Sequence, residues 1–181
     1  MQTMLKKLIV IFLILLPSIA MAQSDTRPLM MQMRNGKVYF DNTYALNANL
    51  KKEDLFSRAL NWFKSSFPYP DKSINAADDK KGEISGTGVF KIITSNPQGH
   101  YYWIKFTVNI AVHNATYELK AFDFYEKPIE SGISNEWSKI EYRWWDFRQG
   151  QPWSAEDQIL FKGLDKEIND MLISLETGMS K

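Results

Sequence analysis

The fold is decided by one stretch of the chain, YYWIKFTVNIAV at residues 101–112. Two sets of side chains alternate along it. The apolar set is Ile104, Phe106, Val108, Ile110 and Val112, and the second set is Trp103, Lys105, Thr107, Asn109 and Ala111. Alternate residues of an extended chain point to opposite faces, so this pattern predicts a half-buried antiparallel strand.

Further strand and turn signals flank this segment. Residues 73–77, 83–93 and 116–126 have strand-like composition, and turn residues separate them at 78–82, 96–99 and 113–115. A shorter strand is expected at 37–40, ended by Asp41 and Asn42. The sequence therefore predicts a meander of antiparallel strands.

Two amphipathic helices are expected outside the meander. Apolar residues recur every three or four positions in 50–67 and again in 154–177. Asn49 is the expected N-cap of the first helix, and Ser154 with Asp157 resembles a capping box that begins the second. Gly178 is expected to end the second helix. Strands in a run, flanked by helices with one apolar side each, predict an α+β fold with both helices on one face of the sheet.

The first 22 residues have the features of an export signal. Lys6 and Lys7 precede the apolar run 8–16, and Ala20-Met21-Ala22 resembles a cleavage site. The run has nine residues, whereas a membrane span needs about 20. We therefore expect cleavage after Ala22, no retained membrane anchor, and a location in the periplasm or outside the cell.

Composition excludes several classes of function. Removal of the two leader lysines would leave 20 basic and 21 acidic residues, a net charge of −1, which argues against nucleic-acid binding. The chain has no cysteine, no H-E-x-x-H and no G-x-S-x-G. His100 and His113 are its two histidines, about 43 Å apart if the strand between them is continuous. We expect no cofactor, no metal site and no catalytic residues.

A family resemblance joins these features. The helix segment EDLFSRALNWF at 53–63 and the glycine strand GEISGTG at 82–88, together with the hairpin 104–124 and the closing helix, resemble a family of exported Bacteroidota proteins. That family is a domain of unknown function with a TATA-binding-protein-like (TBP-like) fold, and it implies no active-site residues. The expected organisation is a signal peptide (1–22), a flexible lead-in (23–36) and one domain (37–181) with an aromatic-rich insertion at 128–153.

The insertion is the first candidate binding surface. Four of the six tryptophans lie in one 17-residue stretch of this insertion, 137–153. The candidate site residues are Trp137, Tyr142, Arg143, Trp144, Trp145, Asp146 and Trp153. A strand over 140–147 would turn Trp144 and Trp145 to opposite faces. Two interpretations stay open: the rings complete the core, or they form a surface for a ligand or partner.

The non-apolar face of the central strand is the second candidate surface. Trp103 and Lys105 lie on it, and a solvated sheet face is the alternative interpretation. Together these features favour a non-catalytic envelope protein that binds a glycan, a peptide or a protein partner through aromatic side chains. The alternatives are an assembly subunit of an envelope complex and, with less support, a carboxylate-dependent glycan hydrolase.

Overall fold

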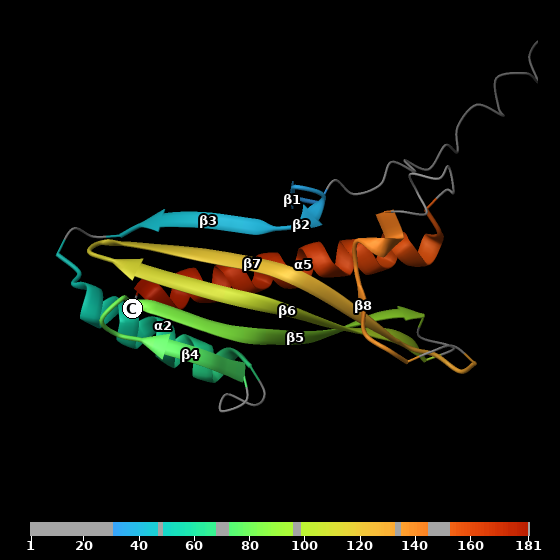
Figure 1. The fold of residues 1–181 in the computed structure, drawn as a ribbon, viewed down its shortest axis with the longest axis horizontal. Coiled ribbons are helices and arrows are strands. Elements are labelled where there is room, and N and C mark those ends of the chain that lie inside the picture. The colour runs from blue at the N-terminus through green and yellow to red at the C-terminus, as the bar shows by residue number, and fades with distance from the viewer. Residues whose placement is uncertain are drawn as a thin grey trace, which may run out of the picture.

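A computed structural model of the chain describes residues 31–46, 49–67, 73–95, 99–132, 135–144 and 153–180. Figure 1 shows one antiparallel sheet with two helices behind it, so the predicted α+β architecture is confirmed. The elements are β1 (Met33–Arg34), β2 (Lys37–Val38), β3 (Phe40–Ala45), α2 (Lys52–Ser66), β4 (Ile74–Asp78), β5 (Glu83–Ser95), β6 (His100–His113), β7 (Thr116–Ile129), β8 (Ser138–Lys139) and α5 (Ala155–Ser180).

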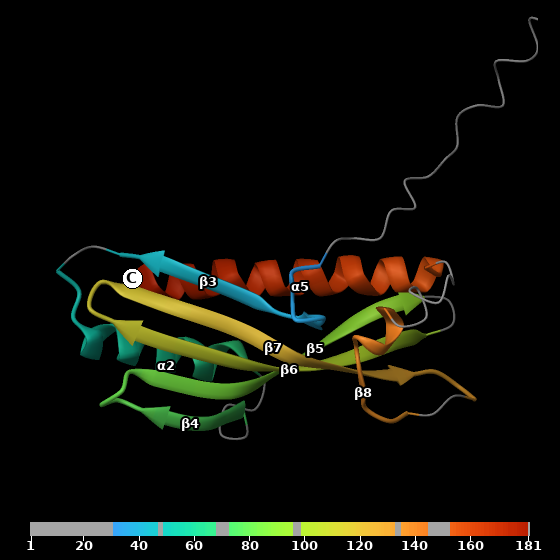
Figure 2. The same cartoon turned by 45° about the horizontal axis from the view of Figure 1, so that its top comes forward.

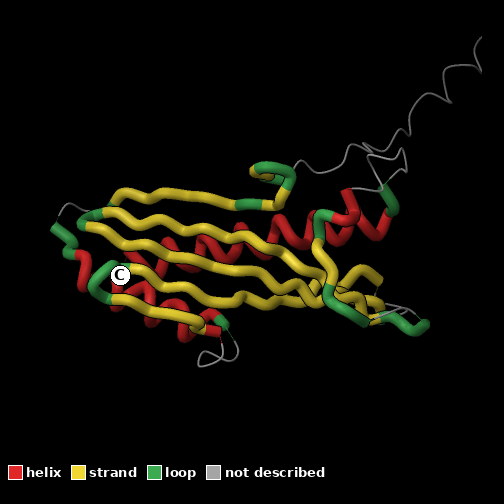
Figure 3. The backbone as a smooth tube through the Cα atoms, in the orientation of Figure 1, coloured by secondary structure: helices red, strands yellow, loops and turns green. Residues whose placement is uncertain are grey.

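The sheet has six strands in the order β3-β7-β6-β5-β4, with β8 added to the outer edge of β7 (Figure 3). The central strand β6 pairs with β5 on one side and β7 on the other along nearly its whole length. Its predicted alternation is confirmed: Ile104, Val108 and Val112 have no solvent exposure. β1 and β2 form a separate hairpin beside the sheet.

A β-bulge interrupts the alternation of β7. Lys105 pairs with Tyr125 whereas Thr107 pairs with Phe122, so β7 carries one extra residue between these pairs. Asp123 lies in this bulge with a φ of 53°, in the left-handed region that aspartate tolerates better than most residues. In a regular strand, residues 119 and 124 would face opposite sides, because an odd number of positions separates them. The bulge lets both Leu119 and Phe124 face the core.

Both helices cover one face of the sheet, and the other face is left open (Figure 2). From α2, Leu55, Ala59 and Phe63 are fully buried against the strands. A Cβ at Gly86 of β5 would lie 2.2 Å from Phe63 Cζ, so glycine is needed for this close approach. α5 runs the length of the sheet, and α2 packs beside it. Neither described helix combines the length and apolar character that crossing a membrane requires.

Three predicted boundaries are wrong. The N-cap of α2 is Lys51, not Asn49, and the Lys52 amide donates a 3.2 Å hydrogen bond to Asn114 Oδ1 from the β6–β7 turn. α5 continues through Gly178 to Ser180, because Gly178 packs against Trp62 of α2 inside the helix pair. β3 continues through Asp41 and Asn42, since pairing with β7 satisfies its backbone.

Candidate functional site

The open face of the sheet carries a band of aromatic and lysine side chains. Its members are Lys91 of β5, Tyr101, Trp103 and Lys105 of β6, Tyr125 and Lys127 of β7, and Trp137 just before β8. Trp103 and Trp137 are 37% and 39% exposed, which is high for indole rings in a folded domain. We call this set the aromatic–lysine band. The band combines residues of both predicted surfaces. Trp103 and Lys105 come from the central-strand surface, and Trp137 comes from the aromatic-rich insertion.

Lysine ammonium groups lie over the rings of the band. Lys105 Nζ lies 4.5 Å from the centroid of Trp137 and 5.2 Å from that of Tyr125, while Lys91 Nζ lies 3.8 Å from that of Tyr101. These are cation–π distances, so the cations are attracted to the ring faces. The sheet thus holds three positive charges and four flat rings on one surface.

A polar hollow of about 200 Å³ lies further along the same face. It is lined by Glu83, Ile84, Ser85, Asn109, Ile110, Ala111, Glu118 and Lys120. Asn109 Oδ1 is buried there and receives no hydrogen bond from the part of the chain that the structure describes. Glu118 accepts a 3.0 Å hydrogen bond from Lys120 Nζ. An acceptor buried without a donor is costly, so the hollow suits a ligand with hydroxyl or N–H groups.

The covered face has a different polar cluster. Arg143 Nε donates a 2.6 Å hydrogen bond to Glu126 Oε2, and Arg143 also pairs with Asp157 while its guanidinium lies 4.8 Å from the Tyr102 ring centroid. Burial raises the pKa of Glu126 above its ordinary value, although the charge of Arg143 opposes this shift. We call Arg143, Glu126, Asp157 and Tyr102 the arginine cluster. Arg143 is therefore a structural residue of the covered face and not a member of the open surface.

The arginine cluster also fixes the start of α5. The predicted capping box is confirmed, because Ser154 Oγ accepts a 3.0 Å hydrogen bond from the Asp157 amide and Asp157 Oδ2 accepts one from the Ser154 amide. Burial alone would raise the pKa of Asp157, but the hydrogen bonds from Ser154 and Arg143 lower it. Asp157 thus caps the start of α5 and pairs with the guanidinium of Arg143.

Two more of the predicted tryptophans complete the core. Trp144 and Trp153 are partly buried, and both rings pack at 4.5 Å from the ring of Phe161 on α5. The predicted strand over 140–147 is wrong in its described part. The strand β8 ends at Lys139, and Tyr142, Arg143 and Trp144 form a helical turn. A helical turn keeps Trp144 near α5 while it leaves Tyr142 64% exposed. Trp145 and Asp146 lie outside the described residues.

Residues 45–127 match the model of DUF4468, a domain of unknown function with a TBP-like fold. This match confirms the predicted resemblance to a domain of unknown function with a TBP-like fold. No curated protein sequence matches the chain. The fold also resembles two solved structures, a TBP-like protein from Parabacteroides distasonis and a DUF4468 family protein from Bacteroides ovatus.

Both structural similarities span almost the whole of the solved chains. The Parabacteroides protein is 15% identical with a TM-score of 0.66, over 82% of this chain and 96% of its own. The Bacteroides protein is also 15% identical, with a TM-score of 0.70 over 88% of this chain and 97% of its own. At this identity the likeness concerns the fold alone.

The DUF4468 match ends at Lys127, just before the segment that supplies Trp137 to the band. Four band residues were not among the predicted site residues: Lys91, Tyr101, Tyr125 and Lys127. The place of Lys91 in the band follows from strand pairing: Lys91 of β5 lies directly opposite Trp103 of β6, so both side chains are on the same face. Tyr125 and Lys127 depend on the bulge at Asp123, which sets the face on which they lie.

Proposed function

We propose that this chain is an exported, non-catalytic binding protein of the cell envelope, and that its open sheet face binds an acidic glycan. The observation that carries this proposal is the aromatic–lysine band, where exposed indole rings and lysine ammonium groups share one surface. Sugar rings stack their apolar faces on aromatic rings, and the carboxylates of an acidic sugar pair with lysines. The polar hollow then offers Asn109 Oδ1 and the carboxylates of Glu83 and Glu118 as acceptors to the hydroxyl groups of the next sugar units.

The dimensions of the surface favour a chain of sugars over a single sugar. Trp103 and Asn109 lie on the same face of β6, six residues apart, which corresponds to about 20 Å. An elongated ligand along β6 would contact the band and the hollow at once.

A glycan fits this face better than a peptide does. Extended peptides usually add a strand to a sheet edge, where free backbone groups can pair. The band lies mainly on β5, β6 and β7, whose backbones already pair with one another. Recognition therefore depends on side chains, which suits a ligand with flat rings and many hydroxyl groups.

The carboxylates favour binding over hydrolysis. A general acid in glycoside hydrolysis needs a raised pKa and access to the substrate. Glu126 has a raised pKa, but it is buried on the covered face and bonded to Arg143. Glu118 in the hollow is paired with Lys120 at 3.0 Å. Neither is suited to donate a proton to a bound sugar.

The experiment is titration calorimetry of the chain with polygalacturonate, an acidic polysaccharide, and with neutral amylose. We expect binding of polygalacturonate that weakens as salt rises, because exposed charges are screened. The double variant Trp103→Ala, Trp137→Ala should lose at least about tenfold in affinity. Tyr142→Ala is the matched control, since it removes an exposed aromatic ring from outside the band.

Three results would contradict the proposal. An equal loss of polygalacturonate affinity in Tyr142→Ala would mean that binding does not depend on the band. Binding of poly-glutamate in place of polygalacturonate would indicate a peptide ligand. Release of new reducing ends from polygalacturonate would indicate a hydrolase.

A further inference from the structure

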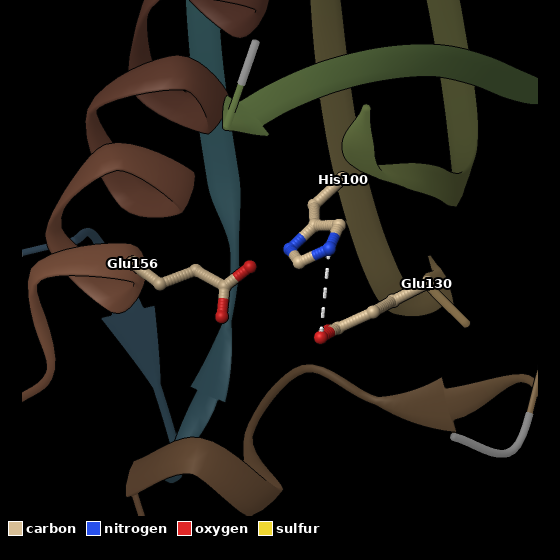
Figure 4. A group of neighbouring side chains, drawn as sticks. All are labelled: His100, Glu130 and Glu156. Carbon is tan, nitrogen blue, oxygen red and sulfur yellow. Dashed lines mark ion pairs between the residues drawn. The ribbon is translucent and has the colours of Figure 1, made fainter. Parts of the chain in front are cut away.

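A cluster of metal-ligating side chains lies on the covered face, at the end of the sheet near the start of α5 (Figure 4). His100 begins β6, Glu130 follows β7, and Glu156 lies in the first turn of α5. One ligand atom from each residue lies within 4.8 Å of the other two. His100 Nε2 and Glu130 Oε1 are 3.6 Å apart. We call these residues the His–Glu–Glu cluster.

We propose that the His–Glu–Glu cluster binds one divalent transition-metal ion of the Zn²⁺ or Mn²⁺ type. This site is independent of the proposed glycan surface, because it lies on the opposite face of the sheet. The sequence predicted no metal site, since its metal motifs depend on close sequence spacing. These three ligands are instead brought together by the β5–β6 turn, the end of β7 and the packing of α5.

The spacing of the three atoms suits a first-row ion. Ligand nitrogen and oxygen atoms lie about 2.0–2.2 Å from zinc, so two tetrahedral ligands are about 3.4 Å apart. The His100–Glu130 distance already meets this separation. Glu156 needs to move by about 1 Å, which a long glutamate side chain allows by small rotations. Three protein ligands leave at least one position for water.

A buried threonine supports the cluster from behind. Thr94 is 8% exposed, and its hydroxyl lies 2.9 Å from Glu156 Oε1 and 3.4 Å from the carbonyl oxygen of His100. A hydrogen bond from Thr94 to Glu156 holds one carboxylate oxygen in place. Metal ligands in proteins are commonly oriented by such second contacts.

The charge around the cluster also favours a cation. Four carboxylates gather at this end of the molecule: Glu126, Glu130, Glu156 and Asp157. Arg143 pairs with Glu126 and Asp157, which leaves Glu130 and Glu156 facing an imidazole that is neutral when it binds a metal. A divalent ion would balance these two charges. The imidazole favours zinc or manganese over magnesium or calcium, which prefer all-oxygen sites.

The test is titration calorimetry of the untagged chain, stripped with a chelator, with ZnCl₂, MnCl₂, MgCl₂ and CaCl₂ in turn. We expect one Zn²⁺ or Mn²⁺ ion per chain and much weaker binding of Mg²⁺ and Ca²⁺. His100→Asn should weaken zinc binding by more than about 100-fold, and Thr94→Val by about tenfold. Glu156→Gln is a second ligand variant, and its metal-free melting temperature shows whether it folds.

The chain supplies a matched control in its other histidine. His113 lies at the opposite end of β6 and is exposed, so His113→Asn should bind zinc as tightly as the unchanged chain. Zinc affinity that is equal in His100→Asn and His113→Asn would overturn the proposal. No binding of Zn²⁺ or Mn²⁺ at about 1 mM would also overturn it.

Discussion

The two faces of the sheet use aromatic residues in opposite ways. On the covered face, Phe106 stacks on Phe124 with ring centroids 5.1 Å apart, and no solvent reaches Phe63. On the open face, Trp103 and Trp137 remain exposed, and lysine ammonium groups lie over rings of the band. Aromatic content therefore does not identify a binding surface. What distinguishes the two faces is whether the rings contact other apolar groups or contact cations that must stay near water.

The bulge at Asp123 keeps these two faces separate along β7. It turns Phe124 and Glu126 toward the helices and Tyr125 and Lys127 toward the open side. Insertion of one alanine between Tyr125 and Glu126 would shift the pairing by one residue, and such a shift moves every later side chain to the other face. Lys127 would then enter the core.

This insertion should therefore have the largest effect of any change discussed. We expect the loss of cooperative thermal unfolding, measured by circular dichroism, because Lys127 would enter the core and Glu126 would leave Arg143. Each change costs several kcal/mol, against a total stability of about 5–15 kcal/mol for an ordinary domain. Replacement of Asp123 by glycine is the control. It keeps the extra residue of the bulge and accepts the positive φ, so its melting temperature should stay close to that of the unchanged chain. A sharp transition in the insertion variant would show that β7 accommodates the added residue in a second bulge.

The second prediction concerns the arginine cluster of the covered face. Arg143→Ala leaves the buried carboxylate of Glu126 without its cation, and removal of one partner of a buried pair costs about 3–5 kcal/mol. Denaturant unfolding at pH 7 should show this loss. Lys139→Ala is the control, because Lys139 is a cation on the same edge outside the cluster. A loss below about 1 kcal/mol would mean that water reaches Glu126 in the variant.

The pH dependence of Arg143→Ala follows from the direction of the Glu126 shift. Burial raises the pKa of Glu126 in the folded chain, and removal of Arg143 raises it further. A carboxyl with a raised folded pKa stabilises the fold while it is protonated, and this stabilisation is lost as pH rises from the ordinary pKa through the folded one. The deficit of the variant should therefore be smallest near about pH 4 and largest at neutral pH. A deficit that does not change with pH would contradict this explanation.

The third prediction tests the close approach of α2 to the sheet. Gly86→Ala would place a Cβ 2.2 Å from Phe63 Cζ and 2.3 Å from the Ser73 carbonyl oxygen. Overpacking of a core typically costs about 1–3 kcal/mol, and here backbone must move as well as a ring. Denaturant unfolding measures the loss. Gly132→Ala is a control without crowding, although its φ of 87° adds backbone strain. A neutral Gly86→Ala would mean that α2 moves away at little cost.

Much of the fold could be predicted from sequence, because it depends on local periodicity. The alternation over 101–112 and the glycine strand 82–88 gave the meander, and the apolar stripes gave both helices. The errors lie where tertiary contacts override local signals. Gly178 did not end α5, because it packs against Trp62. Asn49 did not cap α2, because Asn114 reaches the Lys52 amide from a distant turn.

Less of the candidate site could be predicted, because its residues are brought together by tertiary contacts. The sequence grouped Trp137, Trp144 and Trp153 because they are close along the chain. The structure separates them, since Trp137 contacts Lys105 on the open face and the other two contact Phe161 on α5. Trp144 and Trp153 therefore complete the core, whereas for Trp137 the binding-surface interpretation stays a prediction. His100, Glu130 and Glu156 come together only through folding, so no spacing rule revealed them.

The smallest predicted effect is the loss of stability in Trp103→Ala, and it is measured against that of Trp144→Ala on the covered face. Trp144 packs edge to face against Trp153 at 5.3 Å and lies 4.5 Å from Phe161, so Trp144→Ala should cost about 3 kcal/mol of stability. Trp103 contacts Tyr101 edge to face at 6.1 Å and remains 37% exposed, so Trp103→Ala should cost about 1 kcal/mol or less. Denaturant unfolding of the two variants under the same conditions measures the difference. Equal losses would mean that the open face is packed like the core, and the aromatic–lysine band would then have no free rings to offer a ligand. A small loss of stability in Trp103→Ala together with loss of polygalacturonate binding would show that the covered face supplies stability and the open face supplies recognition.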